Sequence, residues 1–243
     1  MAAVSVQAVK IDDAVRAGGD VIDVLDRGFL ALDGCLATDL AVANGARVSF
    51  NRASQELGER DEGLIRFLMR DRHGSPFEHG YFRFLVKAPI FVVREHHRHR
   101  AGHSYNEWSG RYSKLEAEFY VPENVRTQVG KPGAYSFEPV DEATAEAARE
   151  EIERQSAEAF AAYERMLELG VAKEVARSVL PLNMYTRYYW SCNPRSLMHF
   201  CSLRNAEQAQ YEIREYARAA EEFLRREMPV THAAFVANGR FAP

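Results

Sequence analysis

The sequence predicts an α+β fold in which a mixed or antiparallel sheet packs against helices and the C-terminal half is rich in helix. Residues 81–86 and 183–192 are dense in bulky and aromatic side chains, which is typical of strands. Residues 141–169 and 206–227 instead repeat their apolar side chains at helical spacing. No linker, repeat or low-complexity segment interrupts the chain, so we expect residues 1–243 to form one domain.

The N-terminal half is expected to alternate short helices, turns and strands. Its first 35 residues have a weak pattern, in which Val4-Val6-Val9 allows a strand and 21–25 is apolar. Pro89 suits the first turn of a helix, so we expect helix directly after the strand at 81–86. Residues 36–48 are rich in Ala, Leu and Val, and we expect a helix there that ends at Gly45. Periodicity and Gly–Pro turn signals also predict a polar helix near 54–71, a turn at 73–79 and a helix from Ile90 to Arg98.

The C-terminal half has clearer start and stop signals. Asp141 can cap a long helix that ends at Leu169, with Gly170 as its stop. Segments 102–111 and 123–140 are polar or rich in Gly and Pro, and we expect loops there. The remaining expectations are a short strand at 119–121, a helix at 172–180, the strand at 183–192, a helix from Arg195 to Arg204 opened by Pro194, and a helix at 206–227 ended by Pro229.

Composition and charge narrow the class of protein. A formal net charge of -4 argues against a general nucleic-acid or membrane-surface binder. No apolar run approaches the roughly 20 residues that span a bilayer, and the start lacks a signal-peptide pattern. Cys35, Cys192 and Cys201 show neither metal-ligand spacing nor an even disulfide framework, so we expect free thiols in a reducing, cytoplasmic setting.

The densest group of chemically capable side chains runs from Arg94 to Arg111. Arginines alternate with histidines there, and because their neighbours cannot neutralise them all, we expect them to bind anions. The planar guanidinium suits phosphate oxygens. The sequence therefore predicts a phosphate-bearing ligand whose polar ring is read by Asn106, Glu107 and Ser109.

Other chemistries fit this segment less well. His99 and His103 have the spacing of zinc ligands on a helix, but the flanking arginines would repel a divalent cation, so we predict no metal. We find no phosphate-binding glycine loop and no nucleophile with a base beside it in sequence, and we expect Ser109 to donate a hydrogen bond rather than attack. The alternative is a non-catalytic nucleotide- or RNA-binding protein that uses 94–111 as a basic patch, although the acidic total counts against it.

The order of residues in this segment resembles the signature of a known family. Arg98-His99-Arg100, followed by Ser104, Asn106-Glu107, Ser109 and Arg111, resembles R-H-R-x-x-S-x-N-E-x-S-x-R of flavin-dependent thymidylate synthases. Residues 73–79 are similar to the family's G-x-P-F-E-H segment, and 174–181 and 193–204 resemble its C-terminal segments. The resemblance covers roughly residues 40–225. It departs in two places: Ala101-Gly102-His103 replaces two residues of the family, and His199 stands where some members have asparagine.

The resemblance implies an enzyme that converts dUMP to dTMP with bound FAD and without a cysteine nucleophile. Methylenetetrahydrofolate would supply the methylene group and NADPH the hydride, in a homotetramer with shared active sites. Arg204 would be the catalytic residue: it would favour ionisation of uracil N3 while remaining protonated itself. The implied dUMP contacts are Glu95, His96, His97, Arg98, Glu107, Trp108, Ser109, Gly110, Arg111, Arg177 and Arg204. The implied FAD contacts are His73, Ser75, Arg98, His99, Arg100, Glu107, Asn193, Pro194, Arg195 and His199.

Overall fold

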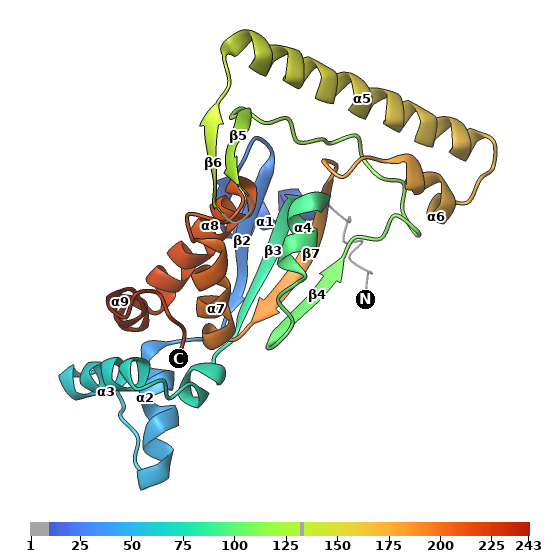
Figure 1. The fold of residues 1–243 in the computed structure, drawn as a ribbon. Helices are drawn as coiled ribbons and strands as arrows, with labels where there is room; N and C mark the ends of the chain where they lie inside the picture. The colour runs from blue at the N-terminus through green and yellow to red at the C-terminus, as the bar shows by residue number, and fades with distance from the viewer. Residues whose placement is uncertain (1–9, 132–133) are drawn as a thin grey trace, which may run out of the picture.

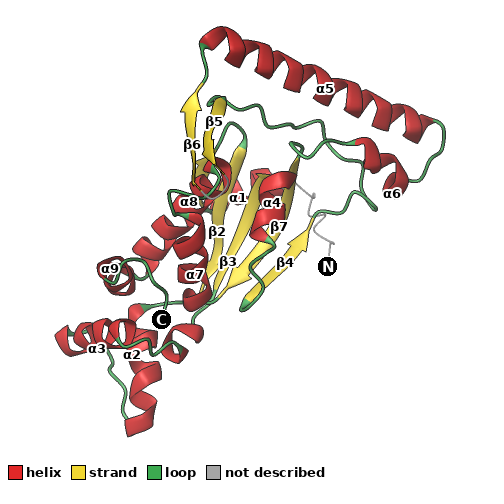
Figure 2. Cartoon of the chain, viewed as in Figure 1, coloured by secondary structure: helices red, strands yellow, loops and turns green. Residues whose placement is uncertain are grey.

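The computed structural model describes residues 10–131 and 134–243. The strand expected at Val4-Val6-Val9 lies outside the described residues. The centre of the fold is a five-stranded antiparallel sheet with the strand order β1-β2-β3-β7-β4 (Figures 1 and 2), so strands from both halves of the chain lie side by side. The strands are β1 (Asp20–Val24), β2 (Gly28–Cys35), β3 (Phe82–Pro89), β4 (His103–Glu107) and β7 (Tyr185–Cys192).

Several helices cover one face of this sheet and others extend from its two ends, whereas α1 packs on the opposite face, where Val15 packs against the cluster of Phe29, Ala31 and Leu85 (Figure 1). Helices α4, α7 and α8 lie on the covered face, and α2, α3 and α9 pack together at one end. The long helix α5 stands at the opposite end, next to the hairpin β5–β6. The helix bounds are α1 (Ile11–Gly18), α2 (Asp39–Arg47), α3 (Glu59–Arg70), α4 (Ile90–His96), α5 (Glu142–Glu168), α6 (Lys173–Ala176), α7 (Pro194–Arg204), α8 (Tyr211–Glu227) and α9 (Pro229–Ala237).

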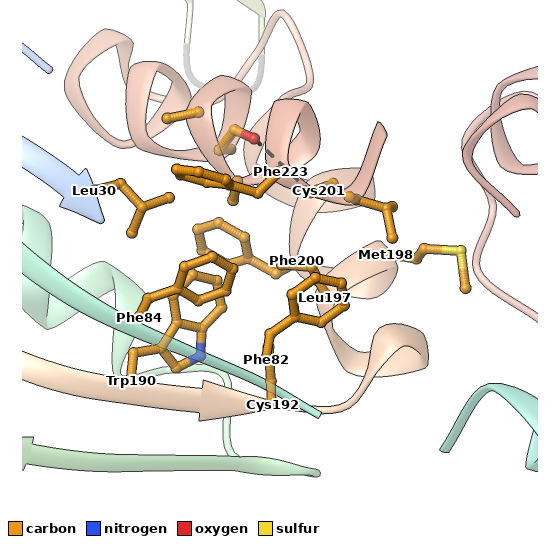
Figure 3. Packing of buried hydrophobic residues seen from close by; sticks show 14 of the residues in the cluster. Leu30, Phe82, Phe84, Trp190, Cys192, Leu197, Met198, Phe200, Cys201 and Phe223 are labelled. Carbon is orange, nitrogen blue, oxygen red and sulfur yellow. Dashed lines mark hydrogen bonds between the residues drawn. The ribbon is translucent and has the colours of Figure 1, made fainter. Parts of the chain in front are cut away.

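The core forms between the covered sheet face and helices α7 and α8. Successive side chains of a strand point to opposite faces, so every second residue of β3 and β7 enters this core. Phe84 of β3 pairs with Trp190 of β7, and their ring centroids are 4.9 Å apart. Phe200 of α7 and Phe223 of α8 pack onto this pair (Figure 3). This packing fixes α7 on the sheet, and α7 carries several of the residues implied to bind ligand.

The helices with strong local signals are confirmed. Asp141 caps α5, because its side chain accepts hydrogen bonds from the backbone and hydroxyl of Thr144. Gly170 follows the helix with a φ of 80°, the left-handed conformation that stops a helix. Asn193 caps α7 by accepting from the backbone N–H of Ser196 at 2.8 Å, and Pro194 occupies the first turn. The polar helix and the strands expected at 81–86 and 183–192 also form.

Two expectations of loop structure are wrong. Residues 103–107 form β4, an edge strand that pairs with β7. Within 123–140 the chain forms a hairpin of β5 (Arg126–Lys131) and β6 (Ala134–Pro139). Both segments are polar because they stay largely exposed. Their strand character therefore comes from backbone pairing, which hydrophobic alternation does not report.

Smaller differences concern single elements. Strand β2 lies in the N-terminal region where only a weak pattern was seen, and the expected strand at 119–121 reduces to one bridge between Phe119 and Met184. The last long helix begins at Tyr211 rather than 206. Pro229 does follow the end of that helix, and it also opens α9, which was not expected. No helix among the residues described here is long and apolar enough to cross a membrane.

Candidate active site

The arginine–histidine segment forms a tight turn at the end of α4. The backbone N–H groups of His97, Arg98 and His99 each bond a carbonyl three or four residues earlier, so the chain keeps turning past the helix. The hydroxyl of Tyr105, from β4, donates to the carbonyl oxygens of His96 (3.1 Å) and His99 (2.8 Å). Tyr105 thus supplies a partner for the carbonyl of His99, past the helix end, and a second donor for the carbonyl of His96. The second half of the signature therefore holds the first half in place.

His96 is a core residue despite its position in the signature. Its side chain is only 2% exposed, and its ring centroid lies 4.3 Å from that of Trp190 and 4.5 Å from that of Phe200. Its Nδ1 shares a 2.6 Å hydrogen bond with the hydroxyl of Tyr188. Burial lowers the pKa of His96 well below its ordinary value, so it is neutral at pH 7. The imidazole of this implied dUMP contact thus lies inside the protein.

The other histidines of the segment are also held neutral. Burial, followed by the charge of Arg204, lowers the pKa of His99 to about 4. Burial likewise lowers the pKa of His103 to about 4, and its Nδ1 accepts a 2.9 Å hydrogen bond from the indole of Trp190. His97 is half-buried and its pKa is lowered for the same reason. The positive charge of the segment therefore comes from its arginines, not from arginines and histidines together.

The C-terminal end of α7 meets this turn through Arg204. Nε of Arg204 donates to Nε2 of His99 at 2.9 Å, and its two terminal nitrogens donate to the carboxylate (3.2 Å) and carbonyl oxygen (3.3 Å) of Glu95. Because Nε2 of His99 accepts, its proton is assigned to Nδ1. Burial raises the pKa of Glu95, and the charge of Arg204 opposes that rise. Two distant parts of the implied site are thereby joined.

Several arginines near the turn remain available to anions. Arg98, Arg100 and Arg177 are exposed and form no ion pair with any residue in 10–131 or 134–243, and the same holds for Arg94. Arg111 pairs with Glu174 at 3.3 Å, but both side chains are more than half exposed. An exposed pair of this kind contributes little, so an anion can compete for Arg111 at small cost.

Strand β4 contains two of the residues that were expected to read one ligand ring together. Asn106 and Glu107 are neighbours in a strand, so their side chains point to opposite faces. Glu107 accepts a 2.8 Å hydrogen bond from the hydroxyl of Thr186. Asn106 and Glu107 both contribute to the lining of a cavity of about 390 Å³, whose wall also includes Leu85 and Tyr189. The joint reading of one ligand ring by Asn106, Glu107 and Ser109 therefore stays a prediction.

A buried ionic network supports the loop that begins at Trp108. Arg187 of β7 is 8% exposed and donates to Asp12 and Glu118, and Lys87 of β3 donates to the same two carboxylates. The guanidinium of Arg187 lies 5.2 Å from the ring centroid of Trp108, and its carbonyl accepts from the Trp108 backbone. Our sequence reasoning did not identify this network. A charged residue inside a bulky strand, such as Lys87, is the signal that could have found it.

The loop itself is held by close packing. The backbone N–H of Arg111 donates to the hydroxyl of Ser109 at 3.3 Å. Gly110 is buried, and a Cβ there would lie 2.9 Å from the side chain of Leu115. The backbone of Leu115 in turn donates to the hydroxyl of Tyr163 on α5. Only glycine allows this approach without a shift of the neighbouring side chain.

Helix α7 also meets the turn at 73–79. Arg195 donates to the carboxylate of Glu78 at 2.6 Å. Gly74 lies directly under Arg195, since a Cβ at Gly74 would be 2.6 Å from the guanidinium carbon. One helical turn further along α7, the ring centroid of His199 is 6.1 Å from that of His99. The structure therefore brings α7, the 73–79 turn and the signature turn together. His73 is exposed, and its ring packs near Phe67 of α3.

The additional residue between Arg100 and Ser104 is accommodated at Gly102. This glycine has a φ of +71°, and a Cβ there would lie 2.2 Å from the hydroxyl oxygen of Ser196. That hydroxyl donates to the carbonyl oxygen of Ala101 at 2.9 Å. The insertion thus bulges against the start of α7, as a glycine at this position permits.

Comparison with known proteins identifies the family. Residues 34–230 match the family model described as thymidylate synthase complementing protein. The chain is 48% identical over 222 residues to the flavin-dependent thymidylate synthase of Streptomyces coelicolor, which covers 85% of this chain and 90% of that protein. It is 47% identical over 215 residues to the enzyme of that name from Thermotoga neapolitana, covering 88% and 94%.

A solved structure agrees with this comparison. The UMP/dUMP methylase PolB from Streptomyces cacaoi, bound with 5-Br dUMP, superposes with a TM-score of 0.83 at 42% identity. The match covers 91% of this chain and 100% of that one. With nearly half of its residues identical to those of such enzymes over most of their length, the chain belongs to the flavin-dependent thymidylate synthase family.

Proposed function

We propose that this chain catalyses the reductive methylation of dUMP to dTMP, with FAD bound, methylenetetrahydrofolate as the one-carbon donor and NADPH as the reductant. The observation that carries the proposal is the contact of Arg204 with His99 and Glu95. It joins the end of α7 to the signature turn, beside exposed arginines that have no ion-pair partner among the described residues. A cationic site lined by neutral imidazoles suits a uridylate.

The side chains at the site have the chemistry that FAD requires. Its diphosphate needs guanidinium or backbone donors, and Arg98, Arg100 and Arg195 present such donors at or near the surface. When bound, FAD supplies the redox and one-carbon-transfer chemistry, while the protein binds, orients and polarises. The proposed contacts remain His73, Ser75, Arg98, His99, Arg100, Glu107, Asn193, Pro194, Arg195 and His199.

For dUMP, we assign the phosphate to the exposed arginines and the uracil edge to Arg204. Arg111 and Arg177 can turn to a phosphate at little cost. The ion pair of Arg111 with Glu174 is exposed, and Arg177 forms no ion pair with any described residue. Arg204 remains protonated and stabilises the negative charge that develops when uracil N3 ionises. His99 supports this by accepting from Nε while neutral, so it adds no competing charge.

No cysteine takes part in the proposed mechanism. Cys192 and Cys201 are buried, and burial raises the pKa of each thiol well above its ordinary value. Cys35 is exposed, yet partial burial of its thiol also raises its pKa. A thiolate is the nucleophilic form, so none of the three is prepared to attack. An ionised uracil has an electron-rich C5, which can act as the nucleophile instead.

We also propose that one domain spans the chain, that the enzyme works in the cytoplasm, and that it assembles as a homotetramer with shared active sites. Large apolar side chains lie on the surface, including Leu36 (78% exposed), Phe50 (76%) and Tyr112 (73%). Exposed groups of this kind favour burial against another chain. The free cysteines suit a reducing compartment. Light scattering coupled to size-exclusion chromatography gives the number of chains directly.

The proposed function is tested by colour and by product. Purified protein loaded with FAD should be yellow, and its flavin spectrum should change when dUMP is added. Mixed with dUMP, methylenetetrahydrofolate and NADPH, it should form dTMP, and omission of any one of them should stop the reaction. Protein that binds FAD yet forms no dTMP under these conditions would contradict the proposal. Protein that binds dUMP but no flavin would favour a plain nucleotide-binding module.

A second candidate substrate is UMP. The solved relative from Streptomyces cacaoi is a UMP/dUMP methylase, and it is known bound with 5-Br UMP as well as with 5-Br dUMP. The two nucleotides differ only in the 2′-hydroxyl, so a site for one can admit the other unless a side chain blocks it. Measuring kcat/KM for both substrates in one preparation decides which is preferred.

A further inference from the structure

The last described residues fold back along α7. Gly239 and Arg240 have φ values of 70° and 58°, which reverse the chain after α9. Arg240 is not glycine, so its left-handed conformation must be held by surrounding contacts. Its carbonyl oxygen accepts a 2.5 Å hydrogen bond from the hydroxyl of Ser202 on α7. We call residues 240–243 the C-terminal strap.

A buried carboxylate anchors the beginning of the strap. Glu221 of α8 is 6% exposed and accepts from Nε of Arg240 at 3.0 Å. It also accepts from the side-chain nitrogen of Asn205 at 2.6 Å and shares a 3.1 Å hydrogen bond with His232 of α9. A buried carboxylate with three partners is costly to disrupt. The strap is therefore tied to the residue that directly follows Arg204.

The other end of the strap reaches the start of α7. Nε of Arg195 donates to the carbonyl oxygen of Pro243 at 2.6 Å, and Pro243 is buried. Nη1 of Arg195 donates to Glu78 at the same distance. Because the guanidinium is planar and rigid, two contacts at different nitrogens fix its orientation. Its Nη2 donates to no residue in the described chain, so the N–H groups of that nitrogen remain free for a ligand.

We propose that the C-terminal strap is a positioning element of the flavin site and that it acts through Arg195. The inference rests on the proposed function, which assigns Arg195 as an FAD contact. A free arginine side chain would have to be ordered when ligand binds, at a cost in conformational entropy. The carbonyl of Pro243 orders the guanidinium in advance, so its remaining donors face the ligand already oriented.

The test is a double-mutant cycle read by FAD affinity. Deletion of residues 241–243 removes the carbonyl acceptor, and Arg195→Met removes the donor while keeping an apolar stem. In a chain shortened to end at Arg240, the terminal oxygens lie near Ser202, about 10 Å along the helix from Arg195, so they cannot replace the lost acceptor. We expect the deletion to weaken FAD binding about tenfold in the parent and to have almost no further effect in the Arg195→Met background.

The controls separate positioning from folding. Phe241→Ser changes an exposed side chain of the strap and should leave FAD affinity at the parent level. Ser202→Ala loosens the strap without shortening it and should weaken FAD binding slightly. This variant keeps the inference testable if the deleted protein fails to fold by circular dichroism.

Three outcomes overturn the inference. One is an unchanged FAD affinity after deletion or after Ser202→Ala. A second is an equal loss in the parent and Arg195→Met backgrounds, which would make the strap a general stabiliser. In both cases a parent that binds FAD and forms dTMP leaves the proposed function standing. A parent that binds no FAD would overturn the proposed function, and the strap's role with it.

Discussion

Nε of Arg204 donates a 2.9 Å hydrogen bond to Nε2 of His99, although the two residues are 105 positions apart in the chain. The bond is possible only while His99 is neutral, and a pKa of about 4 keeps it so at pH 7. The same guanidinium donates to the carboxylate and carbonyl of Glu95. The implied catalytic arginine is thus held at three points, two on Glu95 in the last turn of α4 and one on His99 in the turn that follows.

Replacing Arg204 with Lys should slow methyl transfer roughly ten- to a hundredfold while FAD remains bound. Lysine keeps the charge but lacks the planar fork, so it cannot reproduce contacts made by different nitrogens of one guanidinium. A lost charge-assisted hydrogen bond is worth about 1.5–3 kcal/mol, and about 1.4 kcal/mol is tenfold in rate. The measurement is stopped-flow oxidation of reduced enzyme with dUMP and methylenetetrahydrofolate, beside an FAD titration.

The matched control for that experiment is Arg218→Lys, since Arg218 is an exposed arginine of α8 that pairs only with Glu215 among the described residues. It should turn over at the parent rate. If Arg204→Lys also turns over at the parent rate, Arg204 does not support uracil ionisation. Complete loss of FAD would instead move Arg204 to the flavin site or to the fold.

Simultaneous replacement of Cys35, Cys192 and Cys201 by Ala should leave dTMP formation measurable. Two of these thiols are buried with a raised pKa, and none is positioned as a thiolate. Some loss of stability is expected, because small changes at buried sites commonly cost about 0.5–3 kcal/mol. Turnover is compared with the free energy of unfolding from urea titration. A variant that is fully folded but inactive would mean that the reaction does need a cysteine.

Gly102→Ala should destabilise the protein by roughly 1–3 kcal/mol. Alanine is disfavoured at a φ of +71°, and its Cβ would lie 2.2 Å from the hydroxyl oxygen of Ser196. The control is Gly63→Ala in α3, where a Cβ meets nothing within 4 Å. There alanine should stabilise by about 0.4–1 kcal/mol. Urea unfolding measures the change in the free energy of unfolding for each variant. If Gly102→Ala stabilises the protein as Gly63→Ala does, the bulge at Gly102 is not constrained as described.

Stability should fall as the pH drops from about 6.5 to about 4. His103 has a pKa of about 4 when folded and an ordinary value of 6.5, so the unfolded state binds its proton first. The stabilisation is therefore complete above pH 6.5 and is lost toward pH 4. His103→Gln keeps an acceptor for the indole of Trp190 and removes this titration.

In that window the variant's free energy of unfolding should fall less steeply than the parent's. One proton amounts to at most about 1.4 kcal/mol per pH unit, and solvent screening reduces this for a partly exposed group. Urea unfolding at pH 7, 6, 5 and 4 measures the slope. His79→Gln, at an exposed position, serves as the control. Parallel curves for parent and His103→Gln would show that His103 is not held neutral by the fold.

Much of the fold could be predicted because its signals are local. Asp141 and Asn193 cap their helices through residues three positions away, so a short stretch of sequence contains both partners. Strands β3 and β7 lie at the centre of the sheet, where burial on at least one face selects bulky side chains. The signature residues from Arg98 to Arg111, together with the segments at 73–79, 174–181 and 193–204, were enough to indicate the family.

Elements whose stability comes from distant partners were not predictable in this way. Strand β4 is a polar edge strand, and only its backbone register with β7 makes it a strand. That register decides that Asn106 and Glu107 face opposite sides, which a reading of 102–111 as a loop could not foresee. The buried network of Asp12, Lys87 and Arg187 likewise joins three elements that lie far apart in sequence.

The sequence by itself determined which residue types are present to bind an anionic, ring-bearing ligand, and in what order they occur. The tertiary structure decided their charge and orientation. A histidine is neutral or charged according to the water and charges around it, and only the packed core around His96, His99 and His103 sets that environment. The tertiary structure also fixes the orientation of the Arg204 side chain. Arg204 reaches its hydrogen-bond partners, His99 and Glu95, only because α7 packs against the end of α4 and the turn that follows it.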